Sequence, residues 1–211
     1  MNSNHTKKPA TLLAVATAIT LVAGLTSCAT PQRPGAAPPL VGDTPASEGE
    51  VVGTGHVIQV GDSDPQFCLG PIMESYPPQC SGIGLEGWDW SSVEGHETAN
   101  EVTWGTYAVW GSFDGETLTV SDSVMLALYD PMMVEDPALA PENAGDTPEA
   151  ELLAIQEQLH ADAPFDLLES YPTNGYVFAT VVFDDGTYQE WVDNRYGPDV
   201  VQIRSALKPV E

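Results

Sequence analysis

The chain has 211 residues, of which 42% are hydrophobic and 18% are charged, with 31 acidic residues against six lysines and arginines and a formal net charge of −25. So acidic a surface repels phosphate groups, which argues against nucleic acid and anionic lipid head groups as direct ligands. No residue pattern in the sequence indicates a cofactor or a metal site.

The first 27 residues are expected to be an export signal rather than part of the fold. Lys7 and Lys8 precede a mostly apolar run from Leu12 to Ala23, and small residues follow it. A charged start, a short apolar core and small residues before a cleavage point define such a signal, and the run is too short for a stable membrane-spanning helix. Its removal would take away two lysines and no acid.

The signal ends in Leu25-Thr26-Ser27-Cys28, which resembles the lipobox of bacterial lipoproteins. The resemblance implies that Cys28 receives a diacylglyceryl group and becomes the first residue of the mature chain. Acyl chains such as palmitate each add about 0.8 kcal/mol per buried methylene, so two of them hold a protein firmly on a bilayer. We therefore expect a lipid anchor on the extracytoplasmic face of the cell membrane, with an ordinary secretory signal as the alternative.

Residues 28–50 are expected to form a disordered tether, because Pro, Ala, Gly, Ser and Thr dominate them and almost nothing in them can be buried. A flexible coil of about 20 residues has a mean span of about 25 Å. The tether would therefore carry the folded part beyond the head groups.

Residues 51–130 are expected to form a small β module. Alternating residues indicate strands at 55–60 and 105–113, and Asp114-Gly115 is a hairpin signal before a further strand at 117–120. A barrel similar to the oligonucleotide/oligosaccharide-binding (OB) barrel is the first expectation for this module, and a β-sandwich is the second.

Cys68 and Cys80 are the two cysteines that remain once Cys28 is acylated. In a chain that leaves the reducing cytosol they are predicted to pair, and the loop they close would contribute about 3 kcal/mol to stability. They are too far apart for a Cys-x-x-Cys redox motif, and with three scattered histidines they do not form a zinc pattern.

The rest of the chain is expected to be a linker at 131–145 and an α+β module at 146–211. Asp146 is predicted to cap a helix that reaches His160 and carries Leu152, Ile155 and Leu159 at helical spacing. After it we predict a strand at 176–183, a hairpin turn at Asp185-Gly186, a returning strand at 187–192 and a last strand at 200–207. The module is thus predicted to be a helix plus an antiparallel sheet.

Trp88 and Trp90 are the candidate ligand-stacking residues. In a strand they would share one face, with Asp89 on the other, and such an aromatic pair could stack a sugar or a peptide ring. Core packing is the competing interpretation, because a small barrel needs large side chains inside it. The acidic pairs Asp62/Asp64 and Asp184/Asp185 are interpreted as turn residues rather than as calcium ligands.

Three blocks around the cysteines and tryptophans, Phe67–Gly70, Glu74–Cys80 and Gly87–Trp90, are similar to a region of uncharacterised exported proteins and lipoproteins of high-GC Gram-positive bacteria. The segments Arg195–Val201 and Ser205–Val210 are similar to the end of the same group. The resemblance supports the disulfide and the compartment, and it implies no activity.

We therefore expect a membrane-anchored extracytoplasmic module that binds a cell-wall or protein ligand, with no recognisable catalytic residue. Two alternatives are an envelope hydrolase that uses carboxylates and a structural or assembly partner of envelope proteins. The binding module predicts Trp88 or Trp90 exposed in a groove, the hydrolase predicts converging acids with a raised pKa, and the assembly partner predicts an exposed apolar patch.

Overall fold

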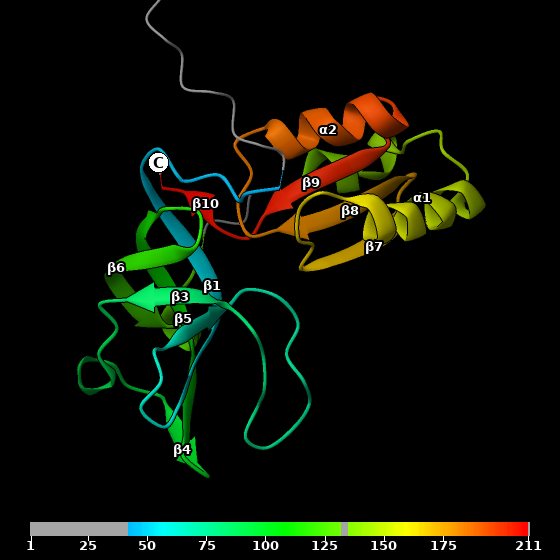
Figure 1. The fold of residues 1–211 in the computed structure, drawn as a ribbon. Helices are drawn as coiled ribbons and strands as arrows, with labels where there is room; N and C mark the ends of the chain where they lie inside the picture. The colour runs from blue at the N-terminus through cyan, green and yellow to red at the C-terminus, as the bar shows by residue number, and fades with distance from the viewer. Residues whose placement is uncertain (1–41, 132–134, 211) are drawn as a thin grey trace, which may run out of the picture. The chain divides into compact units, whose positions relative to one another are not determined.

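A computed structural model describes residues 42–131 and 135–210, so Cys28, the expected export signal and most of the expected tether lie outside it. The described chain is mainly β, with a seven-stranded sheet, a three-stranded sheet and two α-helices (Figure 1). The larger sheet consists of β1 (Glu50–Val60), β2 (Gln66–Cys68), β3 (Ile83–Glu86), β4 (Glu97–Ala99), β5 (Val102–Phe113), β6 (Thr117–Met125) and β10 (Lys208–Pro209).

Five strands of the larger sheet are hydrogen-bonded in a closed ring. β1 pairs with β2 on one side and with β5 on the other, β2 pairs with β3, β3 with β6, and β6 with β5. The β3–β6 pairing is parallel and the other four are antiparallel. The hairpin predicted at Asp114-Gly115 joins β5 to β6 and is confirmed. Outside the ring, β4 pairs with β5 and β10 with β1.

The inward side chains of these strands form one core, in which Val57, Phe67, Tyr107 and Leu118 are fully buried. Glycine is required where two backbones of the ring come close together. A Cβ atom added at Gly55 would lie 2.2 Å from the carbonyl oxygen of Cys68. No side chain fits at such a distance, so this position of β1 must be glycine.

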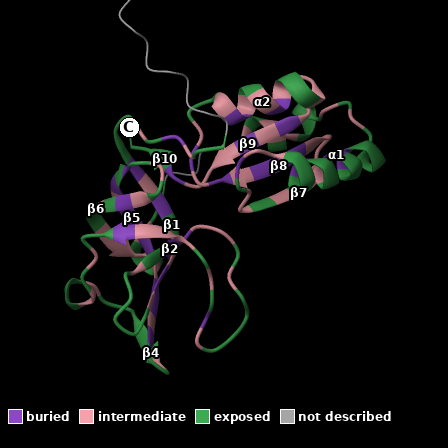
Figure 2. Ribbon diagram, viewed as in Figure 1, coloured by how far each residue is buried: buried purple, intermediate pink, exposed green. Residues whose placement is uncertain are grey.

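The three-stranded sheet consists of β7 (Glu169–Thr173), β8 (Tyr176–Val181) and β9 (Val201–Ser205), and it packs against α1 (Glu149–Asp162) and α2 (Thr187–Tyr196). The predicted first helix is confirmed, and Leu152, Ile155 and Leu159 are buried as expected. Most other residues of α1 are exposed (Figure 2). Its start differs from the prediction, because Pro148 rather than Asp146 occupies the N-cap position and no side chain caps the helix.

The returning strand predicted at 187–192 is wrong, because these residues belong to α2. Gly186 occupies the N-cap position of this helix, and the two acids before it, Asp184 and Asp185, bind its first turn instead of forming a hairpin turn. The Asp184 carboxylate accepts hydrogen bonds from the backbone N–H groups of Tyr188, at 2.9 Å, and Gln189, at 3.3 Å, and Asp185 accepts one from Thr187 at 3.1 Å. A side-chain acceptor for the free N–H groups of the first turn is what favours a helix over a hairpin here.

The prediction of an antiparallel sheet is also wrong for one of its two pairings. β7 and β8 are antiparallel, whereas β8 and β9 are parallel. The cause is α2. Parallel pairing requires that the chain return to the end of the sheet at which the first strand began, and a helix between two strands provides this return.

Part of the expected linker contacts the smaller sheet. It contains the short turns η3 (Pro137–Leu139) and η4 (Pro141–Asn143). Arg204 on β9 donates hydrogen bonds from Nε and Nη2 to the two carboxylate oxygens of Asp136, at 2.6 and 3.0 Å. The bond from Arg204 holds the pKa of Asp136 below its usual value. Asn174 Nδ2 also donates to the carbonyl oxygens of Ala138 and Ala140.

Glutamine side chains from the two helices cover the outer edges of the smaller sheet. Gln189 on α2 donates to the Val201 carbonyl at 2.9 Å and accepts from the Ile203 N–H at 2.9 Å, as a neighbouring strand would. Gln156 on α1 donates to the carbonyl and hydroxyl oxygens of Ser170 on β7. Each glutamine thus occupies backbone groups that an edge strand would otherwise offer to a strand from another molecule.

Replacement of Gln189 by alanine should lower the free energy of unfolding by about 1–3 kcal/mol, because it leaves two buried backbone groups of β9 without partners. Gln156→Ala should cost less, since Ser170 is only half-buried. Gln158→Ala, on the exposed side of α1, is the matched control and should stay within about 0.5 kcal/mol of the wild type. Urea unfolding measures all three, and equal losses would contradict the proposed role of Gln189.

Candidate functional site

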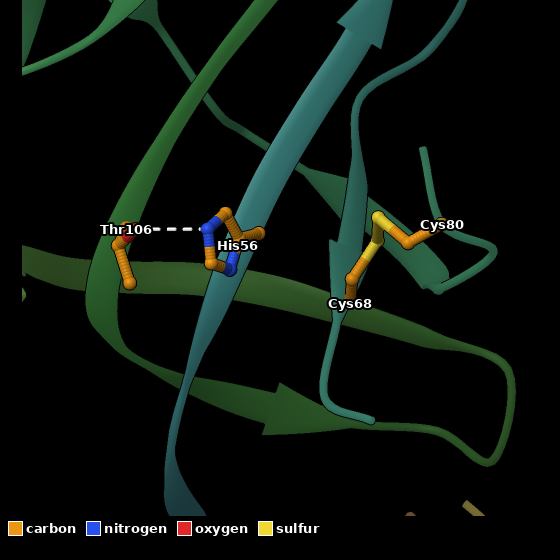
Figure 3. Close-up of a disulfide and its surroundings, with 4 residues drawn as sticks. All are labelled: His56, Cys68, Cys80 and Thr106. Atoms are coloured by element: carbon orange, nitrogen blue, oxygen red, sulfur yellow. Dashed lines mark hydrogen bonds between the residues drawn. A yellow bond between two sulfur atoms is a disulfide. The ribbon is translucent and has the colours of Figure 1, made fainter. Parts of the chain in front are cut away.

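The disulfide between Cys68 and Cys80 is confirmed, with Cα atoms 6.2 Å apart (Figure 3). It joins β2 to the end of a loop of residues 69–82, which runs from β2 to β3. The loop is thereby held at the ring of strands, although it contains no strand of its own and only one isolated bridge, between Met73 and Gln79.

This loop contributes to a second, smaller core on the outer side of the ring. Ile58 on β1 and Trp104 on β5 are opposite each other in the antiparallel register and are 6% and 8% exposed. Cys68 and Val102 are buried in the same cluster, and Ile72 and Cys80 from the loop and its end pack against it. The disulfide therefore helps to hold an apolar cover over the outer face of β1 and β5.

Three large apolar side chains near this cover are exposed. Tyr76 is 71% exposed, and its ring meets that of Trp104 edge-on, with centroids 5.4 Å apart. Met73 is 64% exposed, at the bridge to Gln79, and Val60 at the end of β1 is 57% exposed. Exposing apolar surface to water costs a transfer free energy of roughly 25 cal/mol per Å². Several exposed apolar side chains near one another therefore suggest an interaction site.

A groove of about 270 Å³ lies between the loop and the ends of β1 and β5. It is lined by Ile58, Val60, Ser63, Asp64, Gln66, Pro78, Gln79, Cys80 and Val102. We call the groove together with Val60, Met73 and Tyr76 the disulfide-loop surface. It combines an apolar floor with a few hydrogen-bonding groups, which is the usual composition of a binding site.

Larger hollows of about 740, 570 and 640 Å³ lie elsewhere in the described residues. The first is bordered by Asn143, Tyr176 and Gln202, and the second by Asp114, Asp166 and Tyr188. The first two are lined by none of the exposed large apolar residues, and the third is lined by one, Val210, which is 41% exposed. The disulfide-loop surface, with three such residues, is therefore the more distinctive candidate.

The charge around the disulfide-loop surface is negative. Asp62 and Asp64 lie in the loop between β1 and β2, Glu74 lies in the disulfide loop, and the sequence has no lysine or arginine from residue 34 to residue 194. Arg195 and Arg204, beyond that stretch, already pair with acids. Residues 34–194 therefore contain no lysine or arginine that could neutralise Asp62, Asp64 and Glu74. The disulfide-loop surface should attract positively charged ligands.

His56 lies on the same outer face of β1, opposite both Thr106 on β5 and Cys68 on β2 (Figure 3). Its Nε2 atom shares a hydrogen bond with the Thr106 hydroxyl at 3.2 Å, and burial lowers the pKa of the ring. His56 is thus neutral at pH 7 and adds no positive charge beside the disulfide.

Trp88 and Trp90 lie half-buried against the inner core rather than at the disulfide-loop surface. The Trp88 ring meets those of Tyr107 and Trp90 edge-on, at 4.9 and 5.4 Å, and Trp90 Nε1 donates to Gln59 Oε1 at 2.6 Å. Trp88 Nε1 is buried and has no hydrogen-bond partner among the described residues. Packing thus occupies much of both rings, and ligand stacking on them stays a prediction.

No arrangement typical of catalysis stands out in the described residues. The carboxyl groups with a displaced pKa, Asp89, Asp114 and Asp136, are all shifted downward, mainly by hydrogen bonds that they accept, whereas a general acid needs a raised pKa. Ser170 Oγ lies 2.8 Å from His160 Nε2, but the hydroxyl also accepts a bond from Gln156, and this contact joins α1 to β7. The hydrolase alternative stays a prediction with no observation behind it.

Within residues 42–131 and 135–210, no three His, Cys, Asp or Glu side chains are placed to hold a metal ion. The helices of this part are too short or too polar to cross a membrane.

No protein-family model, curated protein or solved structure matches the chain. The function is therefore inferred from the geometry and the sequence.

Opening the disulfide should lower the free energy of unfolding by about 3 kcal/mol, because the unfolded chain regains the freedom of the closed loop. We expect Cys68→Ala/Cys80→Ala and the wild type in reductant to lose the same amount in urea unfolding. Tryptophan emission should move to longer wavelength as Tyr76 leaves Trp104. Unchanged stability and emission in both samples would mean that the loop holds its place without the bond.

Proposed function

We propose that the chain is a lipid-anchored extracytoplasmic protein that binds a ligand through its disulfide-loop surface. The proposal rests on the exposure of Val60, which lines the groove, and of Met73 and Tyr76 in the loop that borders it, at 57%, 64% and 71%. Surfaces of this kind on a monomer are typical of interaction sites. An exposed apolar patch is the feature expected of a structural or assembly partner of envelope proteins. The exposure of these three residues therefore supports that role more than it supports ligand stacking on Trp88 and Trp90.

We further propose that the ring of five strands is an OB-like barrel. Support comes from the pairing of β1 with both β2 and β5, which closes the ring, and from the single parallel pairing of β3 with β6. OB barrels bind their ligands with the second and third strands and the neighbouring loops. Gln66 on β2 and Ser63 and Asp64 in the loop before it line the groove, so in such a barrel the groove would lie in the corresponding region.

The membrane anchor is proposed from Leu25-Thr26-Ser27-Cys28 and the signal before it. The disulfide agrees with an oxidising compartment, since structural disulfides are rare in the cytosol. A tether of Pro, Ala and Gly after Cys28 would let the disulfide-loop surface meet ligands beyond the head groups.

Replacement of Cys28 by serine should abolish palmitate labelling and release the protein from the membrane fraction, because no acyl chain can then be attached. Ser27→Ala keeps a small residue before the cleavage point and is the matched control. Metabolic labelling followed by cell fractionation measures both properties. A Cys28→Ser protein that stays in the membrane fraction would overturn the anchor.

In its own envelope, the protein should be protected from hydroxyl radicals at Met73 and Tyr76, compared with the purified protein. Oxidation follows exposure, so a bound ligand should slow it roughly tenfold. Tyr171, which is 43% exposed on β7, is the internal control and should react equally in both samples. Equal oxidation of Met73 and Tyr76 in envelope and in solution would contradict binding at this surface.

A further inference from the structure

We infer that the ligand is a segment of a basic protein, which inserts one apolar side chain into the groove and places lysine or arginine beside the acids around it. The inference rests on the proposed function and names the chemistry of its ligand.

The size of the groove favours a single anchoring side chain. Its volume of about 270 Å³ is close to the lower limit of the range of about 300–1,000 Å³ that pockets for free small molecules occupy. Protein interfaces instead often use one large side chain in a small pocket, with further apolar contacts around it. The floor of Ile58, Pro78 and Val102 suits such an anchor.

The residue types around the groove also favour a protein partner. Tyrosine and methionine are enriched in protein interfaces, and Tyr76 and Met73 extend the apolar surface beyond the groove. Trp104, which lies opposite the groove residue Ile58, is only 8% exposed and is covered by Tyr76, so the open aromatic ring of this surface is that of the tyrosine.

Charge complementarity specifies the rest of the ligand. Asp64 lines the groove, and Asp62 and Glu74 lie in the two loops that border it. The long stretch without lysine or arginine, residues 34–194, contains the whole surface. A partner must therefore supply the cations, and an acidic segment would be repelled within a Debye length of about 10 Å.

The test uses the full-length chain in detergent micelles on an array of random 12-residue peptides, with soluble peptidoglycan fragments as a second probe. We expect the bound peptides to combine an aromatic residue or leucine with neighbouring lysine or arginine. Tyr76→Ala and Val60→Ser should each weaken the best peptide about tenfold, as the loss of a central contact does. Asp64→Asn should reduce both affinity and salt dependence.

Tyr171→Ala removes an exposed tyrosine from the smaller sheet and is the matched control, expected to bind as the wild type does. Urea unfolding of each variant separates lost binding from lost folding. Selection of neutral or acidic peptides would overturn the inference, as would basic peptides whose binding survives both Tyr76→Ala and Val60→Ser. Binding of peptidoglycan alone, weakened by Tyr76→Ala, would overturn the inference and leave the proposed function standing. Protection of Met73 in the envelope tests that function separately.

Discussion

The antiparallel pairing of β1 with β5 is the constraint on which the rest of the larger sheet depends. It runs without interruption from Glu50 opposite Ser112 to Val60 opposite Val102. Because alternate residues point to opposite faces, one register decides two cores at once. Val57 and Tyr107 are buried inside the ring, while Ile58 and Trp104 meet on its outer side.

The outer core explains why the disulfide matters for function as well as for stability. Without a cover, Ile58 and Trp104 would expose a large apolar area, and the loop of residues 69–82 supplies that cover through Ile72 and Cys80. The cover leaves Tyr76 and Met73 in solvent. A loop that is joined to β2 by one covalent bond and contains one internal bridge thus presents an apolar surface without a regular element of its own.

Local patterns predicted the features that depend on neighbouring residues. Asp114-Gly115 predicted its hairpin, and the spacing of Leu152, Ile155 and Leu159 predicted α1. The same reasoning failed at Asp185-Gly186, because an acid before glycine suits both a hairpin and a helix cap, and the carboxylate of Asp184 decides for the helix. The disulfide-loop surface could not be predicted, since it arises only when the β1–β5 register places Ile58 opposite Trp104.

Binding at the disulfide-loop surface can be tested in living cells with the photo-cross-linking residue benzoylphenylalanine placed at Tyr76, and with the same residue at Tyr171 as the control. We expect one discrete adduct from position 76 after irradiation and none from position 171. No adduct at position 76, or the same pattern of adducts from both positions, would contradict the claim that the disulfide-loop surface binds a specific partner.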